Sequence, residues 1–333
     1  MCGSITAKAS SFSNIGRNVA RVIILITSLW ISFLILGQQT PPFLTHNAYT
    51  DERVRFQNVR LAKTREFDYH PPSSPSSMQA LNHTLTKSIF IGAILHNNAE
   101  YLHTTLKLVD SIGMMFNSYH VGFYENDSTD GTAEILAQWK EHHQNANNIH
   151  VVSEVLKVRG AVSFGGVNKQ RFDLMAKYRN KYLTMLEKYA PDVDYVMVID
   201  MDIFDTTLDA FLSSFTPEAL AKNWTAVGAN GVYNGKRYYD SLAFRNAEFP
   251  DTRIGRTRKY AQAVYPRDST WVPVDSMFGG MVVYRAECMR GCKYLQDGDC
   301  EHVSLYKCMS QKGEDCRRFF INPAFLVDYQ VFL

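Results

Sequence analysis

The sequence has no excess of charge of either sign and no stripe of basic residues. Its 333 residues include 35 Lys and Arg against 33 Asp and Glu, a formal net charge of +2. Proteins that bind nucleic acids neutralise phosphates with clustered cations, whereas the cations here are scattered among acids. We therefore expect no nucleic-acid partner. Hydrophobic residues make up 46% of the chain, which is enough for the full core of one large domain or two.

The cysteines lack the paired C-x2-C spacing of a structural zinc site. Cys2 stands alone near the N-terminus, and the other five lie close together near the C-terminus, at Cys288, Cys292, Cys300, Cys308 and Cys316. Disulfides in an oxidising compartment are the interpretation that this clustering favours. Because five is an odd number, we expect one of these thiols to remain free.

Residues 22–37, VIILITSLWISFLILG, contain no charged residue. As a helix they would rise about 24 Å, slightly less than a hydrocarbon core of about 30 Å. Basic residues precede this run, and Asp51 and Glu52 follow it, which favours a cytoplasmic N-terminus. We expect a cytoplasmic tail (1–21), a transmembrane signal anchor (22–37) and a luminal remainder, as in a single-pass type II protein of the Golgi or endoplasmic reticulum membrane. The alternative is a cleaved signal peptide, for which ILGQQTPP offers only a weak cleavage site.

Residues 38–87 lack a sustained apolar period of 2 or 3.6 and mix Pro, Ser and Thr with charges, as in HPPSSPSSM. This composition predicts a stem between the anchor and a luminal domain at 88–333. The alternative is an ordered arm that docks on the domain through its aromatic residues. Patterns for N-glycosylation, which suit a luminal glycoprotein, begin at Asn82, Asn126 and Asn223.

Strand-like and helix-like patterns alternate from residue 88 onward. The apolar run Ile89 to Leu95 is too short for a helix and predicts a buried strand, and apolar residues at helical spacing follow it. HVGFYEND and NIHVVSEV predict two further strands, Lys169 to Tyr189 a long helix, and Val193 to Ile199 a fourth strand. This alternation is typical of βαβ units, so we expect an α/β fold with a mixed, mainly parallel sheet flanked by helices.

Two aspartates, Asp200 and Asp202, follow this fourth strand in YVMVIDMDIFD. Alternation in an extended segment turns both side chains to one side, with Met201 opposite. Two like charges beside a buried strand are costly unless a cation neutralises them. Carboxylates suit Mn²⁺ or Mg²⁺, and such sites leave coordination positions for water and substrate phosphates. The alternative is that the two acids cap the next turn and pair with nearby cations.

The order of motifs resembles a known fold. A strand and helix, then ENDSTDGT, then VIDMD are similar to the nucleotide pocket and D-x-D metal site of GT-A glycosyltransferases. The stretches IFIGAILHNNAEYL, YENDSTDGT, RFDLMAKYRNKYL, VDYVMVIDMDIF, YYDSLAFR and FGGMVVYRAEC resemble, in that order, the cryptococcal α-1,3-mannosyltransferases of glycosyltransferase family 69. The resemblance covers roughly Ser88 to Tyr306. Where members of that family often carry an Asn-Asp pair, this chain has D-x-D, which bears on the mannose donor more than on the fold.

The resemblance implies a retaining α-1,3-mannosyltransferase that transfers mannose from GDP-mannose to a glycan hydroxyl. The metal, held by Asp200 and Asp202, would neutralise the departing diphosphate. Arg171 and Arg179 match positions where cations near the diphosphate are expected, although a solvated helix face is the alternative for both. Glu125 or Asn126 would contact the nucleoside, while the acids that follow them could equally form a helix N-cap and turn.

Candidates toward the C-terminus complete the implied site. His302 is a candidate third metal ligand, and Glu301 could contact the acceptor or stabilise the cationic sugar. The alternative for both is a surface turn. Asp240 and Asp275 are further candidates for substrate binding. Gly279 and Gly280 would allow close approach of a backbone, either to a sugar or to another strand.

Three other functions fit the sequence less well. A related GT-A enzyme that uses a UDP-sugar is the nearest alternative. A haloacid-dehalogenase-type phosphatase needs D-x-D-x-T or D-x-D-x-V, whereas Phe204 occupies the last position, and that motif normally opens its fold. A noncatalytic luminal lectin or calcium-binding module would have no use for βαβ units, and no EF-hand spacing is present. We therefore expect a metal-dependent hexosyltransferase.

Overall fold

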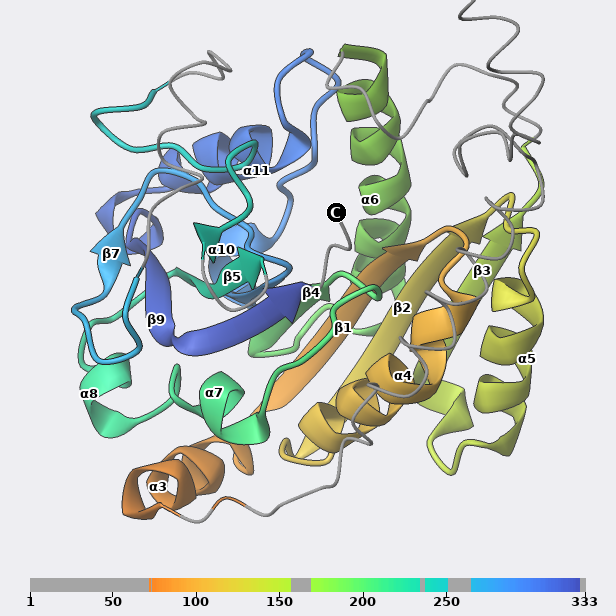
Figure 1. Cartoon of the computed structure of the whole chain (residues 1–333), viewed down its shortest axis with the longest axis horizontal. Coiled ribbons are helices and arrows are strands. Elements are labelled where there is room, and N and C mark those ends of the chain that lie inside the picture. The colour runs from red at the N-terminus through yellow and green to blue at the C-terminus, as the bar shows by residue number, and fades with distance from the viewer. Residues whose placement is uncertain (1–71, 73, 157–168, 234–236, 251–264, 330–333) are drawn as a thin grey trace, which may run out of the picture. The chain divides into compact units, whose positions relative to one another are not determined.

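The protein is built on a mixed, mainly parallel sheet (Figure 1). The computed structural model describes residues 72, 74–156, 169–233, 237–250 and 265–329. Within these residues the strand order is β3-β2-β1-β4-β8-β5-β9-β7, and β6 pairs with β5. The strands are β1 (Ser88–Leu95), β2 (Ser118–Asn126), β3 (Ile149–Glu154), β4 (Tyr195–Ile199), β5 (Ala226–Tyr233), β6 (Arg237–Tyr238), β7 (Val272–Pro273), β8 (Met281–Arg285) and β9 (Phe319–Tyr329). The predicted α/β sheet is confirmed.

Strand direction decides which residues meet at the site. β1 pairs in parallel with β2 and β4, and β2 pairs in parallel with β3. β8 is antiparallel to both β4 and β5, so β5 runs in the same direction as β4. β9 is parallel to β5. The carboxyl ends of β1, β2, β4, β5 and β9 therefore lie at one edge of the sheet.

Helices cover both faces of the sheet. They are α3 (Pro75–Thr84), α4 (Ala99–Gly113), α5 (Thr132–His142), α6 (Lys169–Tyr189), α7 (Leu208–Leu212), α8 (Pro217–Leu220), α10 (Ala286–Met289) and α11 (Glu301–Ser310), with 3₁₀ turns η1 (Ala146–Asn148) and η2 (Glu314–Cys316). Alternate side chains of β1 face opposite ways: Phe90 belongs to the core cluster with α6, whereas Ile89 and Ile91 belong to the cluster with α4. This period of two places one apolar layer on each face.

Part of the predicted stem is regular structure. Ser74 caps α3 by accepting a hydrogen bond from the backbone N of Ser77, and Pro75 begins the helix, which is a favoured start. His83, near the end of α3, lies 3.1 Å from the Tyr195 hydroxyl and stacks on Phe215. Residues 75–84 therefore pack on the domain rather than forming an irregular stem. The sequence did not predict α3, because its polar composition shows no helical period of apolar residues.

The structure confirms the prediction that the five C-terminal cysteines form disulfides and leave one thiol free, and it also gives the pairing. Cys288 bonds Cys316, and Cys292 bonds Cys308. Cys300 is the free, buried thiol. Both disulfides link the segment around α10 to the segment around α11, so they fix the C-terminal region against β8.

The predicted cytoplasmic tail, the signal anchor and residues 38–71 of the stem lie outside the described residues. Within the part of the chain that the structure describes, no helix is long and apolar enough to cross a membrane.

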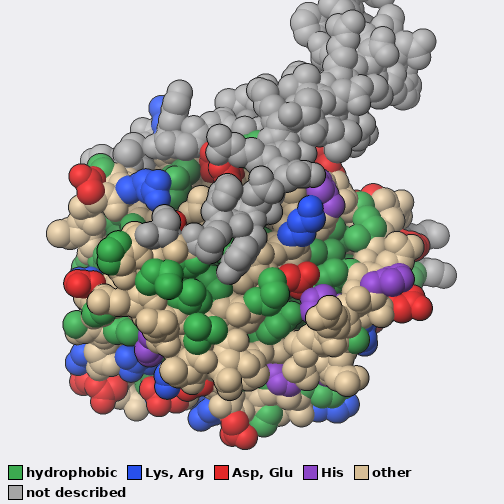
Figure 2. All heavy atoms as spheres, turned by 90° about the horizontal axis from the view of Figure 1, so that it is seen from below, with side chains coloured by type: hydrophobic (Ala, Val, Ile, Leu, Met, Phe, Trp, Pro, Cys, Tyr) green, Lys and Arg blue, Asp and Glu red, His purple; other side chains and the backbone are tan. Residues whose placement is uncertain are grey.

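Charged side chains of both signs mix on the face shown in Figure 2, where Lys and Arg lie among Asp and Glu. Arg317 and Glu314 form an exposed pair of opposite charge at 2.8 Å. Such pairs contribute little to stability, about 0–1 kcal/mol each.

Candidate active site

A cavity of about 310 Å³ lies at the edge of the sheet where the parallel strands end. In open α/β sheets ligands bind at this edge. The cavity is lined by residues that follow β1, β2 and β4, by one face of α6, and by the start of α11. Eight of the residues predicted for the site line it, namely Asn126, Arg171, Arg179, Asp200, Asp202, Asp240, Glu301 and His302. The fold thus gathers most of the candidates into one cavity.

Asp200 and Asp202 lie directly after β4, as predicted. The backbone N of Asp200 donates to the Gly280 carbonyl at 2.8 Å. Met201 is buried in the core, whereas Asp202 is exposed to the cavity, so the expected alternation of side chains holds. Burial, followed by the charge of Asp202, raises the pKa of Asp200 to about 7.

The two carboxylates fit a hard divalent cation such as Mn²⁺ or Mg²⁺, because both offer oxygens to the cavity. A cation would also offset the repulsion between them. Among the described residues, no group of three or more His, Cys, Asp or Glu side chains is arranged to hold a metal. Asp200 and Asp202 would hold the ion together with water and donor phosphates.

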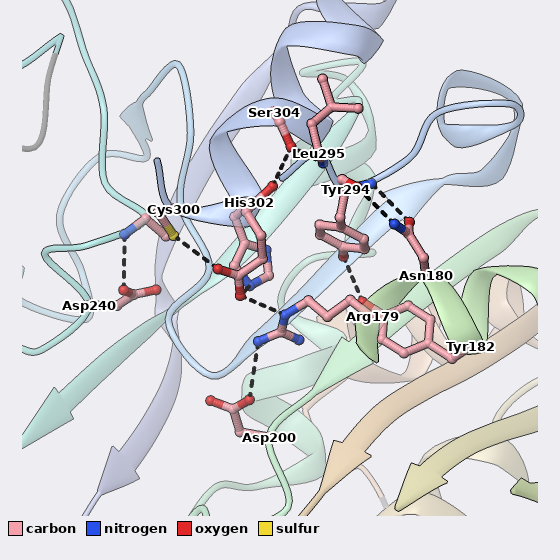
Figure 3. Close-up of polar contacts among 12 residues, drawn as sticks. Arg179, Asn180, Tyr182, Asp200, Asp240, Tyr294, Leu295, Cys300, His302 and Ser304 are labelled. Atoms are coloured by element: carbon pink, nitrogen blue, oxygen red, sulfur yellow. Dashed lines mark hydrogen bonds and ion pairs between the residues drawn. The ribbon is translucent and has the colours of Figure 1, made fainter. Parts of the chain in front are cut away.

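Arg179 joins the aspartate pair to the C-terminal helix (Figure 3). Its Nε donates to Oε1 of Glu301 at 2.8 Å, and its Nη2 lies 3.9 Å from Oδ1 of Asp200. The guanidinium also lies 5.0 Å from the ring centre of Phe278. Only 5% of Arg179 is exposed, so the solvated-face alternative is wrong for this residue. Its Nη1 has no hydrogen-bond partner within the described structure.

Glu301 and His302 begin α11 and are both buried, so the surface-turn alternative is wrong. His302 stacks on Phe278 with ring centres 4.3 Å apart, and its Nε2 lies 3.8 Å from Oε1 of Glu301. The role of His302 as third metal ligand stays a prediction: its ring packs with Phe278 and Glu301, and its ring nitrogens have no hydrogen-bond partner in the described structure. Burial and the charge of Arg179 lower the pKa of His302 well below its usual value. The ring is therefore neutral.

Asp240 is held at the cavity wall by backbone groups. Its Oδ2 accepts from the backbone N of Gly279 at 3.0 Å and its Oδ1 from that of Ala243 at 3.2 Å. Burial raises the pKa of Asp240.

Gly279 and Gly280 closely approach other parts of the protein. A Cβ on Gly279 would lie 2.2 Å from the Ala229 carbonyl, and one on Gly280 would lie 2.0 Å from the Tyr329 hydroxyl. Neither glycine lines the cavity.

Two of the predicted substrate contacts, Glu125 and Asp275, do not line the cavity. Glu125 is buried, with its Oε1 accepting from the backbone N of Ser128 at 2.9 Å and its Oε2 contacting Ser153. Its carboxylate therefore stabilises the turn after β2. Asp275 is exposed and does not line the cavity. Its segment crosses to Arg245, whose carbonyl accepts from the backbone N of Asp275 at 2.7 Å.

Asn126, predicted to contact the nucleoside, and Arg171, predicted near the diphosphate, both line the cavity. Asn126 ends β2, is buried, and donates from Nδ2 to Asp127 at 3.2 Å. Its carbonyl lies 2.7 Å from Nδ1 of His96, which follows β1. Arg171 extends from the first turn of α6. The site therefore offers amide and imidazole groups at one end and guanidinium groups along α6.

Sequence reasoning missed the tyrosines around this site. The hydroxyls of Tyr329 and Tyr239 lie 3.0 Å and 3.4 Å from Oδ2 of Asp200, to which they donate. Tyr294 is hydrogen-bonded to α6 (Figure 3). The Tyr294 hydroxyl accepts from the Tyr182 hydroxyl at 2.6 Å. The side-chain amide of Asn180 donates to the Tyr294 carbonyl and accepts from the Tyr294 backbone N. Tyr239 could have been identified from the sequence, because it precedes the predicted site residue Asp240 in YYDSLAFR. Nothing local marked Tyr329.

Comparison with known proteins gives one family. The family described as cryptococcal mannosyltransferase 1 matches residues 88–312. No curated protein sequence matches significantly.

Solved structures similar to this chain include several glycosyltransferases. A mannosyltransferase from Pyrobaculum calidifontis, solved with GDP-mannose and Mn²⁺, is 15% identical with a TM-score of 0.45, over 84% of this chain and 66% of that one. TarS from S. aureus is 13% identical with a TM-score of 0.41, over 73% of this chain and 60% of that one. Glucosyl-3-phosphoglycerate synthase from Mycobacterium tuberculosis, with Mg²⁺ and UDP, is 14% identical with a TM-score of 0.43, over 79% and 76%. This chain thus spans less than two thirds of the length of the first two.

Proposed function

The chain belongs to the family of cryptococcal mannosyltransferase 1 and is a glycosyltransferase, and we propose that it transfers mannose from GDP-mannose to a glycan hydroxyl. The observation that carries the proposal is the cavity in which Asp200 and Asp202 face the cations of α6. A diphosphate needs positive charge on several sides, and this cavity combines an ion site with Arg171 and Arg179. In keeping with the family resemblance, we propose an α-1,3 linkage and retention of configuration.

Asp200 and Asp202 would hold Mn²⁺ or Mg²⁺, which when bound neutralises charge that develops on the leaving diphosphate. Arg179 is pre-positioned near the same anion, since Glu301 and Phe278 fix its side chain while its buried Nη1 has no hydrogen-bond partner in the described structure. Preorganised donors stabilise developing charge without reorganisation. Neutral His302, whose ring nitrogens lack partners in the described structure, and Asp240 are suited to bind sugar hydroxyls. They would orient the transferred ring.

Nucleotide release by the full chain tests this function. With Mn²⁺, GDP-mannose should be consumed faster than UDP-sugars, and Asp202→Asn should reduce release by about three powers of ten, equivalent to about 4 kcal/mol. The matched control is Asp192→Asn, an exposed aspartate before the amino end of β4, at the opposite edge of the sheet from Asp202. If a UDP-sugar were turned over and GDP-mannose were not, the mannose assignment would be wrong, but the protein would still be a glycosyltransferase.

We also propose that the protein is a type II membrane protein of the Golgi or endoplasmic reticulum, anchored by residues 22–37, with its catalytic domain in the lumen. The two disulfides support this proposal, because they suit an oxidising compartment. Protease added to intact microsomes should spare the catalytic domain. Digestion of that domain without detergent would contradict the topology.

A further inference from the structure

Tyr233, the last residue of β5, is the outermost of three tyrosines whose rings pack on one another beside Asp200. Its ring packs on Tyr239 with centres 5.2 Å apart, and Tyr239 packs on Tyr329 at 4.2 Å. The hydroxyls of Tyr239 and Tyr329 contact Asp200 Oδ2, whereas Tyr233 is 40% exposed. An aromatic surface therefore runs from the aspartate pair to solvent.

Strand direction explains why these rings meet. β5 and β9 run in parallel, and Tyr233 and Tyr329 are partners in their register. Both strands end at the edge where β4 delivers Asp200, and the backbone N of Tyr239 donates to the Gly231 carbonyl at 3.0 Å. The β5–β6 segment, which carries Tyr233 and Tyr239, and the end of β9, which is distant in sequence, thus present aromatic rings at one place.

Tyr233 lies outside the donor cavity but close to its charges. Tyr239 lines the cavity, whereas Tyr233 does not. Its ring packs on Tyr239, whose hydroxyl contacts Asp200, so Tyr233 is one side chain removed from the aspartate pair. A ring bound on Tyr233 would therefore sit beside the reacting centre and not in the space for the donor.

The chemistry of an exposed tyrosine suits a sugar. Tyrosine offers a rigid apolar face with a polar tip, and such side chains dominate recognition surfaces. One face of a pyranose carries C–H groups that pack on an aromatic ring, while its hydroxyls reach nearby carboxylates. We propose that Tyr233, supported by Tyr239, is the stacking platform for a pyranose ring of the acceptor glycan. This inference rests on the proposed function of the same site.

Acceptor kinetics test the platform. The full chain is assayed with GDP-mannose, Mn²⁺ and either methyl α-mannopyranoside or α-1,3-linked mannobiose as acceptor probe. Tyr233→Ala should raise the KM for the probe about tenfold, whereas Tyr233→Trp, which keeps an aromatic face, should stay within about twofold of the wild type. An equal rise in the KM for GDP-mannose would overturn the assignment, because the ring would then serve the donor.

The matched control is Tyr189→Ala. Tyr189 is also 40% exposed, but it ends α6 and stacks on His150, away from the cavity. Its replacement should leave the KM values for donor and acceptor unchanged. If Tyr189→Ala raised the acceptor KM as much as Tyr233→Ala, the effect would not be specific to the platform and the proposal would fail.

A binding measurement separates the platform from the proposed function. Saturation-transfer NMR of methyl α-mannopyranoside with the full chain needs neither metal nor nucleotide-sugar. Loss of the signal in Tyr233→Ala, with the signal kept in Tyr189→Ala, would support the platform even if no nucleotide-sugar were turned over. If mannose transfer proceeded while Tyr233→Ala kept the wild-type signal and acceptor KM, the platform would be refuted and the proposed function would stand.

Discussion

The side chain of Arg179 connects Glu301 to Asp200: its Nε donates to Glu301 at 2.8 Å, and its Nη2 lies 3.9 Å from the Asp200 carboxylate. A single buried cation thereby links α6, α11 and the end of β4. Arg179 is thus an ion-pair partner of Asp200 as well as of Glu301. The same cation therefore has both a structural and a chemical part in the proposed mechanism.

We predict that these two parts can be separated. Glu301→Ala leaves Arg179 buried without its main partner and should lower the free energy of unfolding by about 3–5 kcal/mol. The double variant Arg179→Met/Glu301→Leu replaces the pair with apolar groups and should recover much of that loss, as measured by urea unfolding. Nucleotide release should stay low in the double variant. Recovery of turnover along with stability would show that Arg179 has no role toward the diphosphate.

Binding of Mn²⁺ should depend on pH because of Asp200. A carboxyl with a pKa of about 7 must lose its proton before it ligates a metal, so protons compete with Mn²⁺ below that pH. The apparent Kd should weaken by about tenfold for each unit of pH below 7, until the ordinary carboxylate range is reached. Electron paramagnetic resonance of free Mn²⁺ measures this. Asp200→Asn should bind weakly with no such slope, and a flat wild-type profile between pH 5 and 7 would exclude the mechanism.

Tyr329→Phe should shift that profile to higher pH. The Tyr329 hydroxyl donates to Asp200 at 3.0 Å and lowers the pKa of this carboxyl, because it stabilises the charged form. Its removal should raise the pKa further and weaken Mn²⁺ binding at pH 6.5 by about threefold to tenfold. The control is Tyr195→Phe, which removes a hydroxyl that contacts His83 at the other end of β4. An unchanged profile in Tyr329→Phe would mean that this hydroxyl does not set the charge of Asp200.

The five C-terminal cysteines should differ in reactivity. Without reductant, native protein should contain the Cys288–Cys316 and Cys292–Cys308 bonds. Cys300 should escape alkylation until the protein unfolds, since its thiol is buried and burial raises its pKa. Replacing Cys292 and Cys308 together by Ser should lower the free energy of unfolding by about 2–4 kcal/mol. Peptide mapping after alkylation, with and without urea, measures the first two outcomes, and labelling of native Cys300 would contradict its burial.

The first half of the domain could be predicted from local patterns. Apolar runs and helical spacing identified β1, β2, β3 and β4, and the predicted helix Lys169 to Tyr189 coincides with α6. These elements are repeated βαβ units, in which the period of apolar residues directly reflects burial. The helix α3 was not predicted, because Ser74 and Pro75, which begin it, are residue types that are also common in linkers.

The sequence by itself determined that two carboxylates end a buried strand, because alternation and the preference for binding at carboxyl ends are local rules. Only the tertiary structure decided their surroundings. Glu301 meets Arg179 across 122 residues, and Tyr329 meets Asp200 across 129. Such pairings depend on the directions of β5, β8 and β9, which no local pattern encodes. The same long-range packing turned Arg179 inward, left Asp275 outside the cavity, and placed His302 against Phe278.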